Sequence, residues 1–275
     1  MKRYLWLILI YSLGTHATIF ERLAYPYWLP NKMHKIKEPP KTITSHSIKV
    51  PFQTAELSIH LWFRKTNSHK PVIIYFHGNA TNIESLNKLY ILLGLENLGL
   101  DFVVFDYPLY GLSKGTLNEN TMIASGQAVF DFTQKTFPDR PIFIWGRSIG
   151  TGPAIKITHD NSSKVRGLIL TSPFDNSFGL VKTRFNYLPE KVINFVIRRN
   201  TWESSKRVRS LKLPVLIHHG SNDQVITHKQ GMKLGNQFPK ENVKFISVEG
   251  FGHNDIFEYK FFWKDIRQFI KNTTQ

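Results

Sequence analysis

Short apolar runs bounded by turn-forming residues recur between residues 72 and 248, and segments long enough for helices lie between them. Strands that are buried on both faces of a parallel sheet read as continuous apolar runs of this kind. The runs that fit are 72–76, 102–105, 142–145, 167–170, 215–218 and 243–248. Of two earlier runs, 47–52 and 56–63, the second alternates apolar and polar positions as a half-exposed antiparallel strand does. The pattern predicts an α/β fold with a mostly parallel sheet of about eight strands.

The intervening segments predict helices, which would cover both faces of the sheet. Their approximate positions are 82–98, 120–136, 149–159, 228–237 and 256–271. The stretch 174–212 is too long for a simple connection between two strands, and it contains helix-like segments at 191–199 and 203–210. We therefore interpret residues 174–212 as an inserted cap.

A G-x-S-x-G motif at residues 146–150 directly follows the predicted strand 142–145 and leads into a helix start rich in small residues. This context is typical of a nucleophile elbow, a sharp strand-to-helix turn that exposes a serine hydroxyl. A Cβ atom at either flanking glycine would collide with neighbouring backbone in such a turn. We therefore predict Ser148 as a nucleophile.

A second G-x-S-x-G motif surrounds Ser113, so the pattern alone does not select the nucleophile. Four residues, 107–110, separate this motif from its strand, and the residues that follow Gly115 are polar and turn-like. A loop of this kind does not make an elbow. We interpret Ser113 as a turn hydroxyl in a glycine-rich loop near the site.

The predicted strand 72–76 ends in His77-Gly78-Asn79-Ala80, where a loop N–H would face the carbonyl oxygen attacked by Ser148. We favour the backbone N–H of Asn79 as this donor over Gly78 or Ala80. The N–H of Ile149 would be the second donor of the oxyanion hole. For His77 we expect a structural hydrogen bond within the loop.

Candidates for the acid and the base occur late in the chain. Asp223 follows strand 215–218, at the strand end where open α/β sheets place their functional loops, and its rival is Asp175 after the preceding strand. His253 lies in a glycine-containing loop after the last strand, which gives the chain order Ser, Asp, His. An imidazole here would take the serine proton, and the aspartate would fix its tautomer. The pair at 218–219 is more typical of structural than of metal-binding histidines.

With these residues in place, the chain resembles the α/β-hydrolase superfamily over about residues 46–272. It is most similar to the branch with serine aminopeptidase-like, lysophospholipase-like and depalmitoylase-like members. The resemblance rests on residues 76–80, 106–115, 146–152, 219–223 and 252–253. It implies an α/β-hydrolase fold and a catalytic triad of Ser148, Asp223 and His253. The sequence departs from the branch at Pro108-Leu109, which affects the expected shape of that loop and not the triad.

The first residues are arranged like a targeting segment, with two basic residues before an apolar run at 4–13 and small residues around Ala17. Residues 1–20 are therefore a signal peptide cleaved after Ala17 or an uncleaved membrane anchor, both of which export the rest of the chain, with a merely buried apolar N-terminus as the third alternative. Four prolines and four lysines mark residues 21–45 as a basic linker. The folded domain is expected to span 46–275.

The 275 residues include 36 Lys and Arg against 20 Asp and Glu, which gives a net charge of +16. We expect no nucleic-acid partner, because the charges are spread over several elements and no nucleic-acid-binding motif is present. Between residues 182 and 212, nine basic residues accompany two acidic ones. The predicted cap thus either covers a pocket with an apolar stripe or lies as an interfacial helix on anionic lipid.

The chain contains no cysteine, which excludes disulfides, thiolate metal sites and a cysteine nucleophile. We expect neither a cofactor nor a metal. The residues predict hydrolysis of an ester or thioester, with an apolar acyl group, through an acyl-serine intermediate. A serine peptidase and a noncatalytic binding protein of the same fold remain as alternatives, and the oligomeric state stays open.

Overall fold

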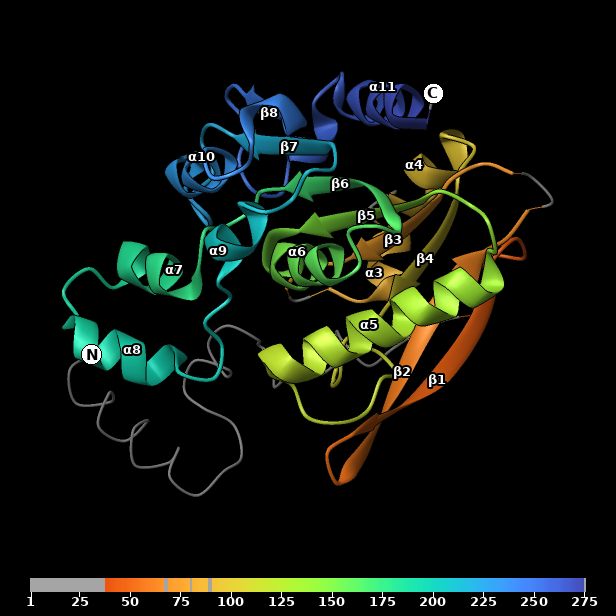
Figure 1. Cartoon of the computed structure of the whole chain (residues 1–275), viewed down its shortest axis with the longest axis horizontal. Coiled ribbons are helices and arrows are strands. Elements are labelled where there is room, and N and C mark those ends of the chain that lie inside the picture. The colour runs from red at the N-terminus through yellow and green to blue at the C-terminus, as the bar shows by residue number, and fades with distance from the viewer. Residues whose placement is uncertain (1–37, 67–68, 80, 89–90, 275) are drawn as a thin grey trace.

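The computed structural model describes residues 38–66, 69–79, 81–88 and 91–274 (Figure 1). Within them eight strands form one sheet in the order β1-β2-β4-β3-β5-β6-β7-β8. The strands are β1 Thr44–Phe52, β2 Ala55–Arg64, β3 Val72–Phe76, β4 Asp101–Phe105, β5 Ile142–Arg147, β6 Val165–Thr171, β7 Val215–Gly220 and β8 Val243–Val248. The strands β3 to β8 run parallel, and β2 pairs antiparallel with both β1 and β4. The predicted mostly parallel sheet is confirmed.

Two apolar clusters cover the two faces of this sheet, as alternation along a strand requires. Ile74 of β3 packs in one cluster with residues of the helices α5 Glu119–Thr136, α6 Thr151–Asp160 and α10 His228–Gly235. Its neighbour Tyr75 packs in the other cluster, with α3 Ile83–Lys88, α4 Ile91–Asn97 and α11 Phe262–Thr274. Helices therefore lie on both faces, as predicted.

Several predicted boundaries differ from the structure for local reasons. The predicted helix 149–159 begins as a 3₁₀ turn, Ser148–Gly150, before α6. The predicted helix 256–271 divides into a 3₁₀ turn, Ile256–Glu258, and α11. In the predicted helix 82–98, α3 and α4 are separate elements.

The strand β8 corrects one expectation about burial. We predicted residues 243–248 as a strand buried on both faces, but Val248 is the single fully buried residue of β8. The strand lies at the edge of the sheet beside β7. Lys244 and Ser247 interrupt its apolar run and are exposed, as an edge strand allows.

The predicted cap region 174–212 contains α7 Ser177–Arg184, α8 Glu190–Ile197 and α9 Ser204–Val208, of which α7 was not predicted. The helices α7 and α8 share a small apolar cluster around Ile193 and Ile197. The part of the cap region next to α9 is held by the main core instead. The indole of Trp202 is buried there and packs so close to α6 that a Cβ on Gly152 would lie 2.6 Å from it. The arrows of β5 and β6 point toward the side on which α7 and α8 lie (Figure 1).

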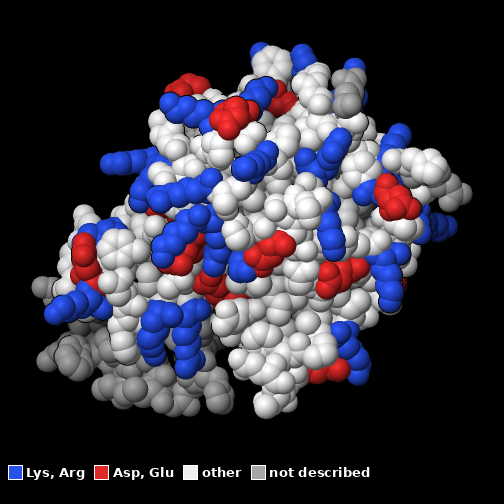
Figure 2. Space-filling view, in the orientation of Figure 1, with Lys and Arg blue, Asp and Glu red and all other residues white. Residues whose placement is uncertain are grey.

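The predicted leader, residues 1–20, and linker residues 21–37 lie outside the described residues. Ile43 is buried and β1 begins at Thr44, so the expected domain start at residue 46 lies inside this strand. In the described part of the chain, every helix is too short or too polar to cross a bilayer. Basic side chains are scattered over the face shown in Figure 2, with acidic ones among them.

Candidate active site

The turn at the end of β5 has the geometry expected of a nucleophile elbow. Ser148 has a φ of 53°, a left-handed conformation that is uncommon for residues other than glycine. A Cβ on Gly146 would lie 2.8 Å from the carbonyl oxygen of Gly150, and a Cβ on Gly150 would lie 2.3 Å from that of Phe76. Glycine is therefore required on both sides of Ser148, as the sequence predicted.

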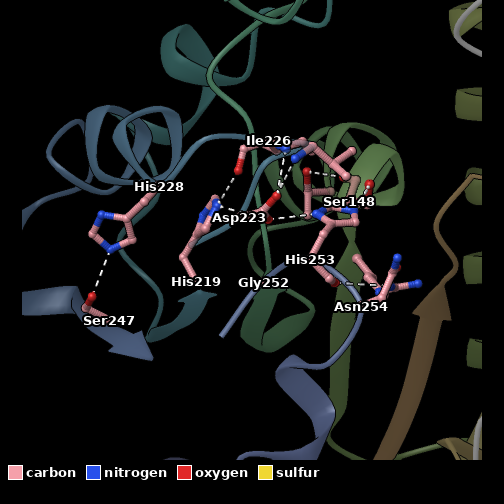
Figure 3. Close-up of polar contacts among 12 residues, drawn as sticks. Ser148, His219, Asp223, Ile226, His228, Ser247, Gly252, His253 and Asn254 are labelled. Carbon is pink, nitrogen blue, oxygen red and sulfur yellow. Dashed lines mark hydrogen bonds and ion pairs between the residues drawn. The ribbon is translucent and has the colours of Figure 1, made fainter. Parts of the chain in front are cut away.

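The three residues predicted as a triad meet at the carboxyl ends of their strands (Figure 3). The Nε2 atom of His253 lies 2.9 Å from Oγ of Ser148. On the other side of the ring, Nδ1 lies 2.7 Å from Oδ2 of Asp223. One hydrogen-bonded line thus joins a serine after β5, a histidine after β8 and an aspartate after β7.

The surroundings of Asp223 keep its carboxyl group ionised. Its Oδ1 atom accepts hydrogen bonds from the backbone N–H groups of Val225 at 2.8 Å and Ile226 at 2.9 Å. Burial alone would raise the pKa of Asp223, but hydrogen bonds from His219 and His253, the charge of His253 and the Ile226 N–H hold it well below its usual range. A carboxylate accepts and does not donate, so Nδ1 of His253 carries the proton and Nε2 faces the Ser148 hydroxyl as an acceptor.

The two rival residues have other partners. The carboxylate of Asp175 contacts Lys233 and Ser205 and accepts a hydrogen bond from Asn176 at 3.0 Å. It therefore anchors the start of the cap region to α9 and α10.

Ser113 donates a hydrogen bond to the carbonyl oxygen of Asp106 at 2.7 Å and accepts one from the backbone N–H of His60 at 2.8 Å. Both roles are structural. The second G-x-S-x-G motif thus fastens its loop to β2.

The loop after β3 runs directly against the nucleophile. His77 donates from Nδ1 to the carbonyl oxygen of Gly78 at 2.7 Å, the hydrogen bond within the loop that we expected. Burial lowers the pKa of His77, and the Asp106 carboxylate opposes that shift. A Cβ on Gly78 would lie 3.4 Å from Cβ of Ser148, so the neighbouring Asn79 begins next to the elbow. The donor roles of the Asn79 and Ile149 backbone stay predictions, and residue 80 lies outside the described residues.

Two tyrosines that the sequence did not identify as part of the site hold this loop. The hydroxyl of Tyr110 donates to Oδ1 of Asn79 at 2.6 Å, and that of Tyr107 donates to the carbonyl oxygen of His77 at 3.2 Å. Both belong to the 106–115 stretch that carries the family resemblance, which was the available signal. A third residue that was missed, Arg147, contacts the histidine loop and is treated below.

Strand order, helices on both faces and the serine, aspartate and histidine after β5, β7 and β8 define an α/β-hydrolase fold. The family described as "Serine aminopeptidase, S33" matches residues 67–193. The "Lysophosphatidylserine lipase ABHD12" of Danio rerio is 32% identical over 186 residues, which cover 63% of this chain and 49% of that protein. The chain therefore spans about half the length of this relative.

Solved structures agree on the fold. The esterase Pf2001 of Pyrococcus furiosus matches with a TM-score of 0.69 and 17% identity, over 88% of this chain and 96% of that one. The mouse alpha/beta hydrolase domain-containing protein 10 matches with a TM-score of 0.63 and 16% identity, over 82% and 99% of the two chains. These likenesses show that the chain has the α/β-hydrolase fold, and over residues 67–193 its sequence is similar to the serine aminopeptidase family.

Proposed function

We propose that the chain is a serine hydrolase in which Ser148 is the nucleophile, His253 the general base and Asp223 the residue that orients the base. The hydrogen-bonded line from Asp223 through His253 to Ser148 carries this proposal. The tautomer argued above leaves Nε2 able to take the serine proton, which the reaction needs in its first step. Asp223 would then stabilise the imidazolium that forms.

The reaction would proceed through an acyl-serine. As Oγ of Ser148 adds to the substrate carbonyl carbon, its proton moves to Nε2 of His253, and the backbone N–H groups of Asn79 and Ile149 stabilise the oxyanion. Collapse of the tetrahedral intermediate breaks the bond to the leaving group, which takes the proton from Nε2. Water then repeats the two steps and releases the acid.

The substrate we propose is an ester or thioester, lipid-like, with an apolar acyl group. The match to a lysophosphatidylserine lipase and the fold shared with an esterase support this class. A serine peptidase of the same fold is the second candidate, supported by the description of the matching family.

A fluorophosphonate probe tests the nucleophile, with a matched control inside the chain. We expect covalent labelling of the wild type and of Ser113→Ala, and none of Ser148→Ala. An unlabelled wild type, or equal labelling of Ser148→Ala, would reject a catalytic Ser148. Turnover of p-nitrophenyl esters of increasing chain length, lysophospholipids and aminoacyl p-nitroanilides would separate esterase from peptidase.

We also propose that the outer face of α8 lies on an anionic lipid surface. Tyr187, Val192 and Phe195 are 70%, 40% and 56% exposed, and exposed Lys191 and Arg199 lie on or next to the same helix. Apolar side chains flanked by cations are typical of interfacial helices. Lys191→Glu with Arg199→Glu should lower turnover of a lysophospholipid in anionic vesicles and leave turnover of a soluble ester unchanged. Equal turnover of the vesicle substrate would refute this surface.

Export through residues 1–20 remains our proposal for localisation, with the alternatives of cleavage after Ala17 and a retained anchor. N-terminal sequencing of the protein from the expressing cell separates them. A chain that begins at Thr18 in a soluble fraction would rule out the anchor, and an intact N-terminus in the membrane fraction would rule out cleavage.

A further inference from the structure

Arg147 occupies the variable position immediately before Ser148, yet its side chain makes specific long-range contacts. Its Nη2 atom donates to the backbone carbonyl oxygen of His253 at 3.2 Å and to Oδ1 of Asn254 at 2.8 Å. Its guanidinium carbon lies 5.1 Å from the ring centre of Phe257. One side chain therefore joins the nucleophile turn to the loop that carries the proposed base.

The guanidinium is also close to the loop after β3. A Cβ on Gly78 would lie 3.4 Å from both Nη1 of Arg147 and Cβ of Ser148. Arg147 thus lies where three segments meet: the elbow, the loop with the proposed oxyanion donor and the histidine loop.

Burial makes this arrangement costly for the folded protein. Arg147 is 7% exposed, and among the described residues no carboxylate lies within ion-pair distance of it. The Nε atom of Arg147 is buried and has no hydrogen-bond partner among the described residues. Desolvation of a buried charge without an ion-pair partner lowers the free energy of unfolding by roughly several kcal/mol. Carbonyl and amide oxygens and the face of Phe257 offset part of this, so stability alone is a poor reason for an arginine here.

From these contacts we infer that Arg147 is a positioning residue that holds the His253 backbone at the correct distance from Ser148. This inference rests on the proposed function. Because Arg147 and Ser148 are adjacent in the chain, a hydrogen bond from Arg147 to the His253 carbonyl fixes the base relative to the nucleophile. The tie acts on the backbone, whereas Asp223 acts on the ring, so the two residues constrain the same imidazole independently.

The test compares Arg147→Met, which keeps the apolar stem and removes every donor, with Arg147→Lys, which keeps the charge and one possible contact. We expect kcat on a soluble ester to fall by about 10- to 100-fold in Arg147→Met, because a displacement of about 1 Å costs roughly 100-fold. The KM should change by less than about threefold, since Arg147 contacts His253 and not the substrate. Arg147→Lys should recover part of the loss.

Arg140→Met is the matched control. The side chain of Arg140 is also largely buried, at 7% exposure, but it pairs with Asp101 at the opposite ends of the strands. We expect this variant to lose stability and to keep kcat per folded molecule. A kcat in Arg147→Met as high as that of Arg140→Met would overturn the inference, as would Arg147→Lys being no better than Arg147→Met.

A spectroscopic readout separates this inference from the proposed function. The Nδ1–H proton of His253 in its bond to Asp223 should give a downfield proton resonance, which we expect to shift or broaden in Arg147→Met and to stay unchanged in Arg140→Met. If the wild type is not labelled by fluorophosphonate, the hydrolase proposal fails while this signal still reports the tie. If the resonance is unchanged in Arg147→Met, the positioning role of Arg147 is rejected, even when the enzyme is active.

Discussion

Replacing Asp223 by asparagine should reverse the tautomer of His253. The two oxygens of Asp223 have different environments: Oδ1 accepts from the N–H groups of Val225 and Ile226, and Oδ2 faces Nδ1 of His253. The asparagine oxygen would remain at Oδ1, where two backbone donors need an acceptor. Its NH₂ group would then face His253 and force the proton from Nδ1 to Nε2. In that tautomer Nε2 cannot accept the Ser148 proton.

Loss of the correct tautomer with the geometry intact lowers kcat by about 10⁴-fold in a serine triad. Because each tenfold corresponds to about 1.36 kcal/mol, this is about 5 kcal/mol of transition-state stabilisation. We expect KM to change little, because the substrate-binding surface is unaltered. The assay is turnover of a soluble p-nitrophenyl ester per folded molecule, with folding checked by circular dichroism.

Asp175→Asn is the control, since Asp175 is also buried but contacts Lys233 and Ser205 and not His253. It should lower the urea midpoint of unfolding and leave kcat within about threefold, because a lost structural contact acts on stability. An Asp223→Asn enzyme that retains a tenth or more of wild-type kcat would refute the tautomer argument. If Asp175→Asn lost turnover instead, the orienting role would belong to Asp175.

Three further predictions concern the elbow, the loop after β3 and pH. Gly150→Ala places a methyl group 2.3 Å from the Phe76 carbonyl oxygen, so urea unfolding should show a loss of about 1–3 kcal/mol and fluorophosphonate labelling should slow. Tyr110→Phe removes the hydrogen bond to Asn79 and should lower kcat more than it raises KM, measured by steady-state kinetics. Burial lowers the pKa of His218 to about 4, below the unfolded value of about 6.5, so the unfolded chain binds this proton first as pH falls. The contribution of neutral His218 to the free energy of unfolding should be fully present above about pH 6.5 and should fall by up to roughly 3 kcal/mol as the pH drops to about 4. His218→Gln should therefore reduce the change in the urea midpoint over this pH range.

The sequence predicted the parallel core well because burial on both faces leaves a strong local signal. The bounds of β3 and β8 agree with the apolar runs at 72–76 and 243–248. The elbow could be assigned to Ser148 and not Ser113 for a local reason too, since a serine directly after a strand and before a helix requires the turn that the structure contains.

What the sequence did not reveal depends on contacts between distant segments. The partner of Arg147 lies 106 residues away, and no spacing rule connects a strand end to a loop at that separation. The edge position of β8 follows from strand order, which the apolar run does not encode, although Lys244 within the run was a hint. The helix α7 is short and largely polar, so it lacks the apolar periodicity that identifies a longer helix.

The packing of α8 apart from the main core has a consequence for how this scaffold can diversify. The buried apolar residues of α8, Ile193 and Ile197, contact α7 in a small cluster of their own. Leu180 of α7 and Trp202 instead pack in or against the core that supports α6 and the serine turn. Substitutions on α8 can therefore be made without altering the packing that supports the serine turn. Laboratory evolution could therefore vary α8 and retain the proposed catalytic residues.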